Sequence, residues 1–309
     1  MEERKLDFER NKVEVLTLPE LKQTYKEVAP NGQPAFGMYH FEVLERILEM
    51  FSACCNVEVN EIFAANNGDS RYPGVSVIRD LEPTLGKGAL GCHTLRRVYA
   101  NIETGLRIDD GITINVAFSY NQRGLQVGIG PNVHVCKNQT ILGAQHLFST
   151  YSVFGTIMRD SAYHNAEMLL MALQDYVDSF QRHQSDIYEA FLTMKNTHYD
   201  VDDVMQLFGL FLFHRVLSDT KHQSIRTKSI YPLNGTQINA ACERFLLSAP
   251  SCKSQSWDGW ELMNILNFDM KPDKSDIPFL LSYLYRIYFI MKKFYAYKNG
   301  EEKFIGGNL

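Results

Sequence analysis

An alternation of large apolar residues with small, mostly polar ones at positions 112–119 constrains the fold of this chain more than any other feature. Because successive side chains of a strand point to opposite faces of a sheet, a period of two indicates a strand. We expect one face to enter the core and the other to present small polar groups, as in an antiparallel sheet. The apolar positions are Ile112, Ile114, Val116 and Phe118, and the positions between them are Thr113, Asn115, Ala117 and Ser119.

Short runs of β-branched and aromatic residues lie on both sides of this strand, separated by clusters of Gly, Pro, Asn and Asp. Asp109-Asp110-Gly111 and Asn121-Gln122-Arg123-Gly124 have the composition of hairpin turns. Gly128, Gly130 and Pro131-Asn132 fail the pattern G-x-G-x-x-G, and we interpret them as a further turn. The sequence therefore predicts an antiparallel meander whose other strands are Val75–Arg79, Leu95–Ile102, Leu125–Ile129 and Val133–Cys136.

Apolar residues recur at helical spacing on both sides of the predicted meander. The stripe at 41–51 predicts an amphipathic helix that packs against the sheet. From about residue 140 the pattern is helical to the end, with Asp200 as a candidate N-cap and a second cap near Asp276. The stripes are Phe41, Leu44, Ile47, Leu48 and Phe51; Ala166, Leu169, Leu170, Leu173, Val177 and Phe180; Val201, Val204, Leu207, Phe208, Phe211 and Leu212; Ile238, Ala241 and Phe245; Trp260, Met263, Ile265 and Leu266; and Leu280, Leu281, Leu284, Ile287, Tyr288, Met291 and Phe294.

The predicted fold class is α+β: an antiparallel β meander with an N-terminal helix and a large helical C-terminal half. With 45% hydrophobic residues among 309, the chain can build a core without disulfide or metal staples. We expect an N-terminal arm and linker at 1–35, an α+β domain with the sheet at 36–140, and a helical region packed on it at 141–309.

Composition favours a cytoplasmic protein. Six cysteines are too sparse for a secreted disulfide scaffold, and the N-terminus MEERKLDFER is charged where a signal peptide is apolar. The last apolar stripe contains Arg286 and reaches Lys292-Lys293 after about 14 residues, short of the roughly 20 that cross a bilayer. We therefore expect no membrane partner.

The formal charge of −5 is unevenly distributed along the chain. Residues 71–159 hold nine basic and five acidic residues, a balance of +4, whereas residues 161–210 hold two basic and eight acidic residues, a balance of −6. The β region is therefore the positive part of an acidic protein, which is the one compositional indication of an anionic partner.

Basic and aromatic residues in the predicted meander are of the types that bind phosphates and stack on exposed bases. Neighbouring arginines on a strand face opposite ways, so only one of Arg96 and Arg97 can join a given face. Solvated turn charges with core aromatics are the alternative interpretation. The candidate nucleic-acid-binding residues are Arg96, Arg97, Arg107, Arg123, Lys137, Tyr99 and Tyr120.

Two groups of residues have the chemistry of metal ligands. Cys92, His93, His134 and Cys136 offer two sulfurs and two imidazoles, a set that zinc accepts, although their spacing matches no standard zinc module. Paired carboxylates such as Asp109 and Asp110 can hold magnesium, but an Asp-Gly turn explains them equally well. The motifs H-E-x-x-H, G-x-S-x-G and C-x-x-C are absent, and no cofactor is predicted.

The segment from Pro73 to Gly143 resembles the phage/plasmid-like proteins of domain-of-unknown-function family 932 and their Bacteroidetes relatives. The resemblance rests on Asp110-Gly111, on Ser119–Gly124 and on Val135-Cys136-Lys137-Asn138, and farther on Pro232–Ile238 and Trp260–Asn267 look like C-terminal signatures of the family. It implies an origin on phages, prophages, plasmids or integrative elements, in a bacterial host cell or a phage particle, and implies no established activity. Asn138 or Thr140 is a candidate cap for a helix beginning near Ile141.

Three functions remain open at this point. The first is a non-catalytic accessory factor in DNA transactions that binds nucleic acid, single strands more than duplexes, through the basic β region. The second is a virion or host-interaction protein that contacts other phage or host proteins without catalysis. The third is a metal-dependent enzyme. A homo-oligomer is compatible with each of them.

Overall fold

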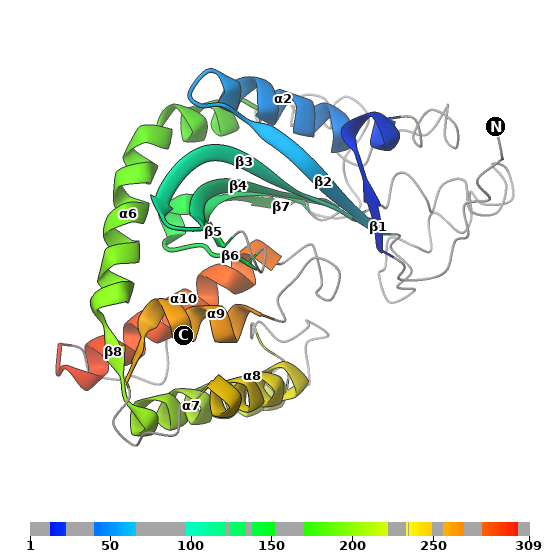
Figure 1. Cartoon of the computed structure of the whole chain (residues 1–309). Coiled ribbons are helices and arrows are strands. Elements are labelled where there is room, and N and C mark those ends of the chain that lie inside the picture. Colours follow the sequence, from blue (N-terminus) through cyan, green and yellow to red (C-terminus); the bar gives the residue numbers. More distant parts are fainter. Residues whose placement is uncertain are drawn as a thin grey trace, which may run out of the picture.

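A strongly curled antiparallel sheet lies at the centre of the computed structural model (Figure 1). The structure describes residues 13–22, 40–65, 97–121, 124–133, 138–151, 170–221, 233, 235–248, 256–268 and 280–301. The strands follow the order β1-β2-β3-β4-β5-β6, and β7 also pairs with β5. Their bounds are β1 Val13–Leu16, β2 Glu58–Ala65, β3 Arg97–Asp109, β4 Ile112–Asn121, β5 Gly124–Val133, β6 Asn138–Gln139 and β7 Leu147–Tyr151.

The α+β class and the antiparallel meander are confirmed. The β3–β4 hairpin closes where Asp110 and Gly111 follow Asp109, and Gly111 has the positive φ of 70° that such a turn requires. Asn121 pairs with Gly124 across the second predicted turn. The predicted strand Val75–Arg79 lies outside the described residues.

The predicted turn at 128–132 is wrong, because β5 runs unbroken from Gly124 to Val133. These glycines do not form a turn; their missing side chains let another segment of the chain lie close against β5. A Cβ at Gly130 would lie 1.9 Å from the carbonyl oxygen of Thr140, and one at Gly128 would lie 2.6 Å from Cδ1 of Ile141. The carbonyl of Pro131 accepts a hydrogen bond from the Thr140 N–H at 2.9 Å. Glycine in this strand therefore lets the chain after β6 pack directly on β5.

Helices cover both faces of the sheet (Figure 1). Helix α2 and helical residues 170–178 lie on one face, and α9 and α10 lie against the other. Farther from the sheet, α7 and α8 form the base of the molecule. The helix bounds are α2 His40–Ser52, η1 Ala144–His146, α6 Phe180–Asn196, α7 Val201–Lys221, α8 Gly235–Ser248, α9 Gly259–Asn267 and α10 Leu280–Lys298.

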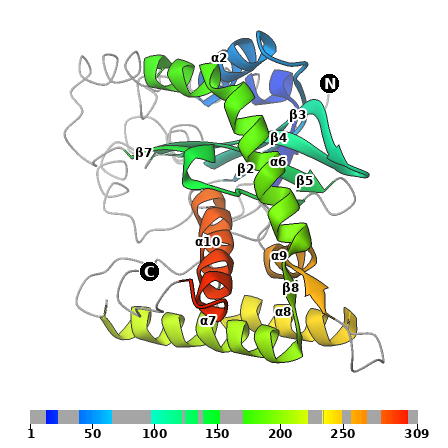
Figure 2. The ribbon, with the colours of Figure 1, turned by 90° about the vertical axis from the view of Figure 1, so that its left-hand side faces the viewer.

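Helix α6 passes along one side of the sheet and reaches from the upper layer to the base (Figure 2). Its first turns place Phe180 and Ile187 in the core on the α2 side, and its last turns place Phe191 and Met194 in the core on the α9 side. A two-stranded ribbon of β8 (His198–Tyr199) and β9 (Trp257–Asp258) joins its end to α9. Sequence periodicity missed this helix as a separate element.

The N-terminal helix prediction is confirmed, since Leu44, Ile47 and Phe51 of α2 are buried in one cluster with sheet residues. Two other expectations need correction. The segment expected to be an arm supplies the edge strand β1, which pairs with β2. The chain is not helical from residue 140, because β7 returns to pair with β5. Within the described residues, no helix is both long and apolar enough to cross a bilayer.

Both faces of the sheet are buried, which corrects the expectation that the polar face is open. Ile114, Val116 and Phe118 enter the α2-side core, whereas Ile112 belongs to the opposite one. The polar residues between them are buried beneath the α9–α10 layer: Thr113 (6% exposed), Asn115 (0%) and Ser119 (0%).

Candidate functional site

The most unusual chemistry in the described residues is a buried group of uncharged polar side chains on the α9–α10 face of the sheet. We call Asn101, Thr113, Asn115, Asn132 and Gln139 the carboxamide cluster. They come from four strands, and all except the half-buried Asn101 are at most 6% exposed. The strand register places Asn132 opposite Thr113, and Asn101 opposite Ala117 four residues farther along β4.

Three hydrogen bonds join four of these side chains in a row, and each side chain in the row donates to the next. Thr113 Oγ1 donates to Asn115 Oδ1 at 2.8 Å, Asn115 Nδ2 donates to Asn101 Oδ1 at 2.8 Å, and Asn101 Nδ2 donates to Asn132 Oδ1 at 3.1 Å. In a flat sheet the Cα atoms of Asn101 and Asn132 would be roughly 16 Å apart, from the usual rise per residue and strand spacing. Their contact therefore requires the sheet to curl toward this face, as Figure 1 shows.

Gln139 extends the cluster to β6. Its Nε2 donates to the carbonyl oxygen of Gly130 at 3.1 Å and lies 3.4 Å from that of Asn115, while its buried Oε1 has no hydrogen-bond partner in the structure. Beside it, Thr140 Oγ1 accepts a hydrogen bond from Asn267 Nδ2 of α9 at 3.1 Å. The predicted capping role of Thr140 is wrong, because no α-helix begins near Ile141; the side chain of Asn138 lies outside the described residues. Thr140 instead joins the sheet to α9.

A second group contains the most perturbed imidazoles. His146, at the end of η1, is 0% exposed, and neither of its ring nitrogens has a hydrogen-bond partner. Its ring packs edge-on against His183 of α6 with centroids 5.5 Å apart. Burial, with the neighbouring His183 second, lowers the pKa of His146 to about 4, although Asp186 opposes the shift. His146 is therefore neutral near pH 7.

The surroundings of this histidine pair are structural. Tyr176 donates its hydroxyl proton to the His146 carbonyl oxygen at 2.8 Å, and Ser179 donates to the Tyr176 carbonyl oxygen at 2.8 Å. Because the Ser179 proton is used there, the contact of 2.7 Å between Ser179 Oγ and His183 Nε2 assigns the donor to the histidine. The arrangement fastens α6 to the sheet and leaves Ser179 without the free base that a nucleophile needs.

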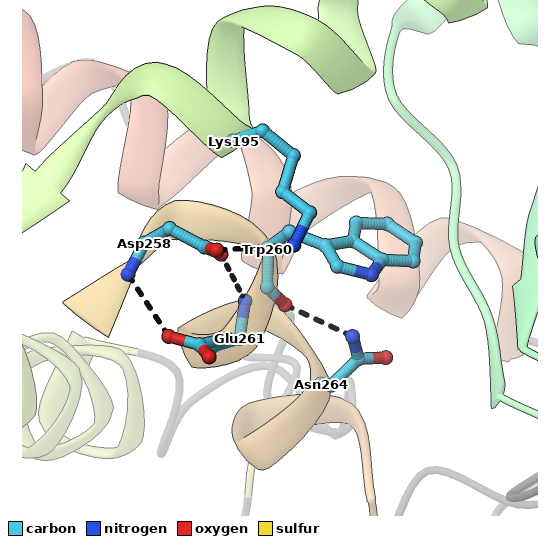
Figure 3. A network of polar contacts seen from close by, with 5 residues as sticks. All are labelled: Lys195, Asp258, Trp260, Glu261 and Asn264. Atoms are coloured by element: carbon cyan, nitrogen blue, oxygen red, sulfur yellow. Dashed lines mark hydrogen bonds and ion pairs between the residues drawn. The ribbon is translucent and has the colours of Figure 1, made fainter. Parts of the chain in front are cut away.

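A third polar network holds the joint between α6 and α9 (Figure 3). Asp258 caps α9: its Oδ1 accepts from the Glu261 N–H at 2.7 Å, and Glu261 accepts from the Asp258 N–H at 3.2 Å. Lys195, in the last turn of α6, donates to Asp258 Oδ2 at 3.1 Å. Asn264 Nδ2 donates to the carbonyl oxygen of Trp260 at 3.0 Å. A capping box with a cation at a helix C-terminus is a structural device.

Most of the candidate basic residues for nucleic-acid binding lie at or beyond the limits of the described residues. Arg97 begins β3, whereas Arg96, Arg123 and Lys137 lie outside the described residues. Arg107 lies toward the other end of β3, opposite Thr113 of β4. Arg107 is exposed, and the side chains of the other four lie outside the described residues.

The proposed stacking role of the two tyrosines is wrong. Tyr99 is 3% exposed and Tyr120 is 4% exposed, and they lie in the two different cores on opposite faces of the sheet. Burial also raises the pKa of the Tyr99 hydroxyl. Neither ring can reach an unpaired base without unfolding the sheet.

The predicted metal ligands receive little support. Cys92, His93, His134 and Cys136 lie outside the described residues. Asp109 and Asp110 flank the β3–β4 turn, where Asp109 Oδ1 accepts from the Asp110 N–H at 2.8 Å, as turn chemistry predicts. Among the side chains that the structure describes, no three His, Cys, Asp or Glu residues are grouped as a metal site.

Sequence reasoning missed the carboxamide cluster and the histidine pair. Asn101, Asn115 and Asn132 are each ordinary in a strand that is polar on one face, and only the curl of the sheet brings them together. His146 and His183 are 37 positions apart and fit no motif. Comparisons with protein-family models, with curated proteins and with solved structures found no match to this chain.

Proposed function

We propose that this protein is a non-catalytic accessory protein of a phage- or plasmid-like element, and that it binds nucleic acid at one end of its sheet. The observation that carries the proposal is the positive balance of residues 71–159 within an acidic chain. In the sequence, Arg96 and Arg97 directly precede Val98, which pairs with Tyr120 of β4, and Arg123 stands between Asn121 and Gly124, the last pair of β4 and β5. Clustered cations of this kind hold phosphates and release counterions on binding.

The polar groups at the centre of the molecule support a role without catalysis. The carboxamide cluster is neutral and mostly buried, so it offers neither a nucleophile nor a proton carrier for a reaction at pH 7. The preference for single strands depended on stacking by Tyr99 and Tyr120, and their burial removes that basis. Binding would therefore depend on phosphate contacts, which single strands and duplexes both offer.

The test is fluorescence anisotropy with a single-stranded and a duplex oligonucleotide across a series of salt concentrations. The variant carries Arg96→Gln, Arg97→Gln and Arg123→Gln together. We expect it to lose at least about tenfold in affinity and to reduce the slope of log K against log salt by about 2.

The matched control carries Arg107→Gln, near the other end of β3, and Lys137→Gln, four positions after Val133, the last residue of β5. Its affinity should stay within about twofold of the parent protein, because charges beyond a Debye length of about 10 Å act weakly. A parent protein without salt-dependent binding would refute the proposal. Equal losses in both variants would refute the location of the site.

A further inference from the structure

Exposed apolar side chains gather at the base of the molecule. Of the eleven large hydrophobic side chains with marked exposure in the described residues, six belong to α7 and α8. These two helices lie together as the layer farthest from the sheet (Figures 1 and 2). The six are Val201 (46% exposed), Met205 (58%), Leu212 (42%), Phe213 (60%), Leu246 (67%) and Leu247 (87%).

On α7 the exposed residues form one continuous face. At 100° per residue, Val201, Met205, Gly209 and Leu212 fall within one arc, and the buried residues occupy the opposite arc. The buried set is Val204, Leu207, Phe208 and Phe211. The exposed arc also includes Asp202, Gln206 and Phe213, so a single charge lies on a face of about three turns. A solvent-facing helix surface usually carries far more charge.

Helix α8 extends this surface. The rings of Phe208 on α7 and Phe245 on α8 pack with centroids 6.0 Å apart, which ties the two helices together near their middle turns. Leu246 and Leu247 follow Phe245 directly and turn away from its buried side. Summed over the six residues, the exposed area is roughly 600–700 Å², of the same order as the largest apolar patch of ~300–600 Å² on a typical monomer.

We propose that the exposed faces of α7 and α8 form the interface of a homodimer in which two α7 helices cross near Gly209. The exposed area approaches the ~800 Å² that each partner buries in a standard interface, which a second copy of the same base would match. A two-fold contact places a surface on itself, and the α7 face, with Asp202 as its one charge, does so with little repulsion. On α8 the exposed Glu243 lies beside Leu246 and Leu247. A Cβ at Gly209 meets nothing within 4 Å, so a second helix can approach there closely.

The first test is the mass in solution, measured by light scattering and by sedimentation from about 1 to 100 µM, a range that detects micromolar dissociation. The parent protein should have the mass of two chains. The variant Met205→Glu/Leu212→Glu should raise the dimer dissociation constant at least about 100-fold, since it buries four charges in the interface. The control Tyr188→Glu/Leu192→Glu changes equally exposed residues of α6 and should remain dimeric.

The second test keeps the interface intact. Gly209→Cys should form a disulfide between two chains under mild oxidation, because the two-fold axis brings both copies within the ~4.4–6.8 Å that a disulfide spans. Leu192→Cys on α6 is the matched control and should remain monomeric on a non-reducing gel. If Met205→Glu/Leu212→Glu does not fold, the comparison of Gly209→Cys with Leu192→Cys tests the proposed interface by itself.

A parent protein that is monomeric throughout the concentration range would overturn the proposal. The base would then be covered by another segment of the chain or by another protein. A dimer that survives Met205→Glu/Leu212→Glu, or equal crosslinking through Gly209→Cys and Leu192→Cys, would also overturn it, since the contact would then lie elsewhere.

Discussion

The two faces of the central sheet are equally buried but are built from opposite chemistry. The α2 face is mostly apolar, with Ile102, Ile114, Val116 and Phe118 at 5% exposure or less. The α9–α10 face carries the carboxamide cluster, together with Ala117 and two glycines that admit the covering chain. Apolar burial stabilises the first face, whereas the second must satisfy its polar groups with one another.

This difference shows what an alternating pattern does and does not imply. Alternation at 112–119 predicted the strand and the side that enters the main core, because the hydrophobic effect sorts side chains by face. It could not show that a second helical layer covers the polar face. Burial of that face is tolerated because its amides and hydroxyls form hydrogen bonds within the sheet.

The largest effect is expected from Phe118→Ala on the apolar face. Phe118 is 0% exposed and its ring stacks on Tyr120 with centroids 6.2 Å apart. Removing it leaves a cavity that a close-packed core cannot refill, at a cost of about 3–5 kcal/mol in the free energy of unfolding. Urea denaturation followed by circular dichroism measures the change. A loss below about 1 kcal/mol would mean that this face is loosely packed.

The next largest effect is a dependence of the unfolding free energy on pH, and it comes from His146, which lies against α6. In the unfolded chain His146 has an ordinary pKa near 6.5, and burial lowers it to about 4 in the folded protein. Between these values the unfolded chain binds the proton more readily, so stability falls as the pH drops from 6.5 toward 4. We expect a loss of roughly 2–3 kcal/mol across that window.

His183, whose pKa burial also lowers, contributes in the same direction. The charged groups around the pair act in opposite senses on His183, since Asp186 raises its pKa and Arg182 lowers it. Thermal unfolding of the parent and of His146→Phe between pH 7 and pH 4 provides the comparison. The variant should lose most of the pH dependence; an unchanged profile would place the acid sensitivity in other groups.

A smaller effect is expected from Asn115→Ala on the polar face. The substitution removes the acceptor of Thr113 Oγ1 and the donor to Asn101 Oδ1. We expect a loss of about 2 kcal/mol, as for buried polar groups left without partners. The matched control is Thr113→Val/Asn115→Leu, which removes both partners of one hydrogen bond and should cost less per bond lost. Equal unfolding energies for the parent and Asn115→Ala would show that water already satisfies the cluster.

The smallest effect is expected where the polar face meets α9. Thr140→Val removes the acceptor of Asn267 Nδ2 while keeping the side-chain shape, at a cost of about 1 kcal/mol. Double-mutant cycles with Asn267→Ala, measured by urea denaturation, isolate the pair. A coupling energy near zero would mean that apolar packing alone holds α9 to the sheet.

Those parts of the fold that depend only on residues close together in the sequence could be predicted from it. The Asp110-Gly111 turn could be predicted because glycine adopts a positive φ easily. Helix α2 could be predicted because Leu44, Ile47 and Phe51 recur at helical spacing. The α6 stripe was readable in principle, since His183, Ile187, Phe191 and Met194 recur at helical spacing, but the histidine at its start weakened the signal.

Features that depend on distant segments could not be read in this way. Gly130 looked like a turn residue because nothing near it in sequence reveals Thr140 against its backbone. Tyr99 and Tyr120 looked available for stacking because a pattern of types does not distinguish an outer face from a second core. The carboxamide cluster required the register of four strands and the curl of the sheet before its members could meet.

The carboxamide cluster also favours the native strand alignment over shifted ones. A slip of β4 by one residue would exchange its faces and place Val116 and Phe118 among the amides, with Asn115 in the α2 core. Apolar burial therefore penalises a slip by one residue, and a slip by two residues would break the hydrogen bonds that run from Thr113 to Asn132. Misaligned intermediates would leave several amides buried without partners, so they should be short-lived on the folding pathway.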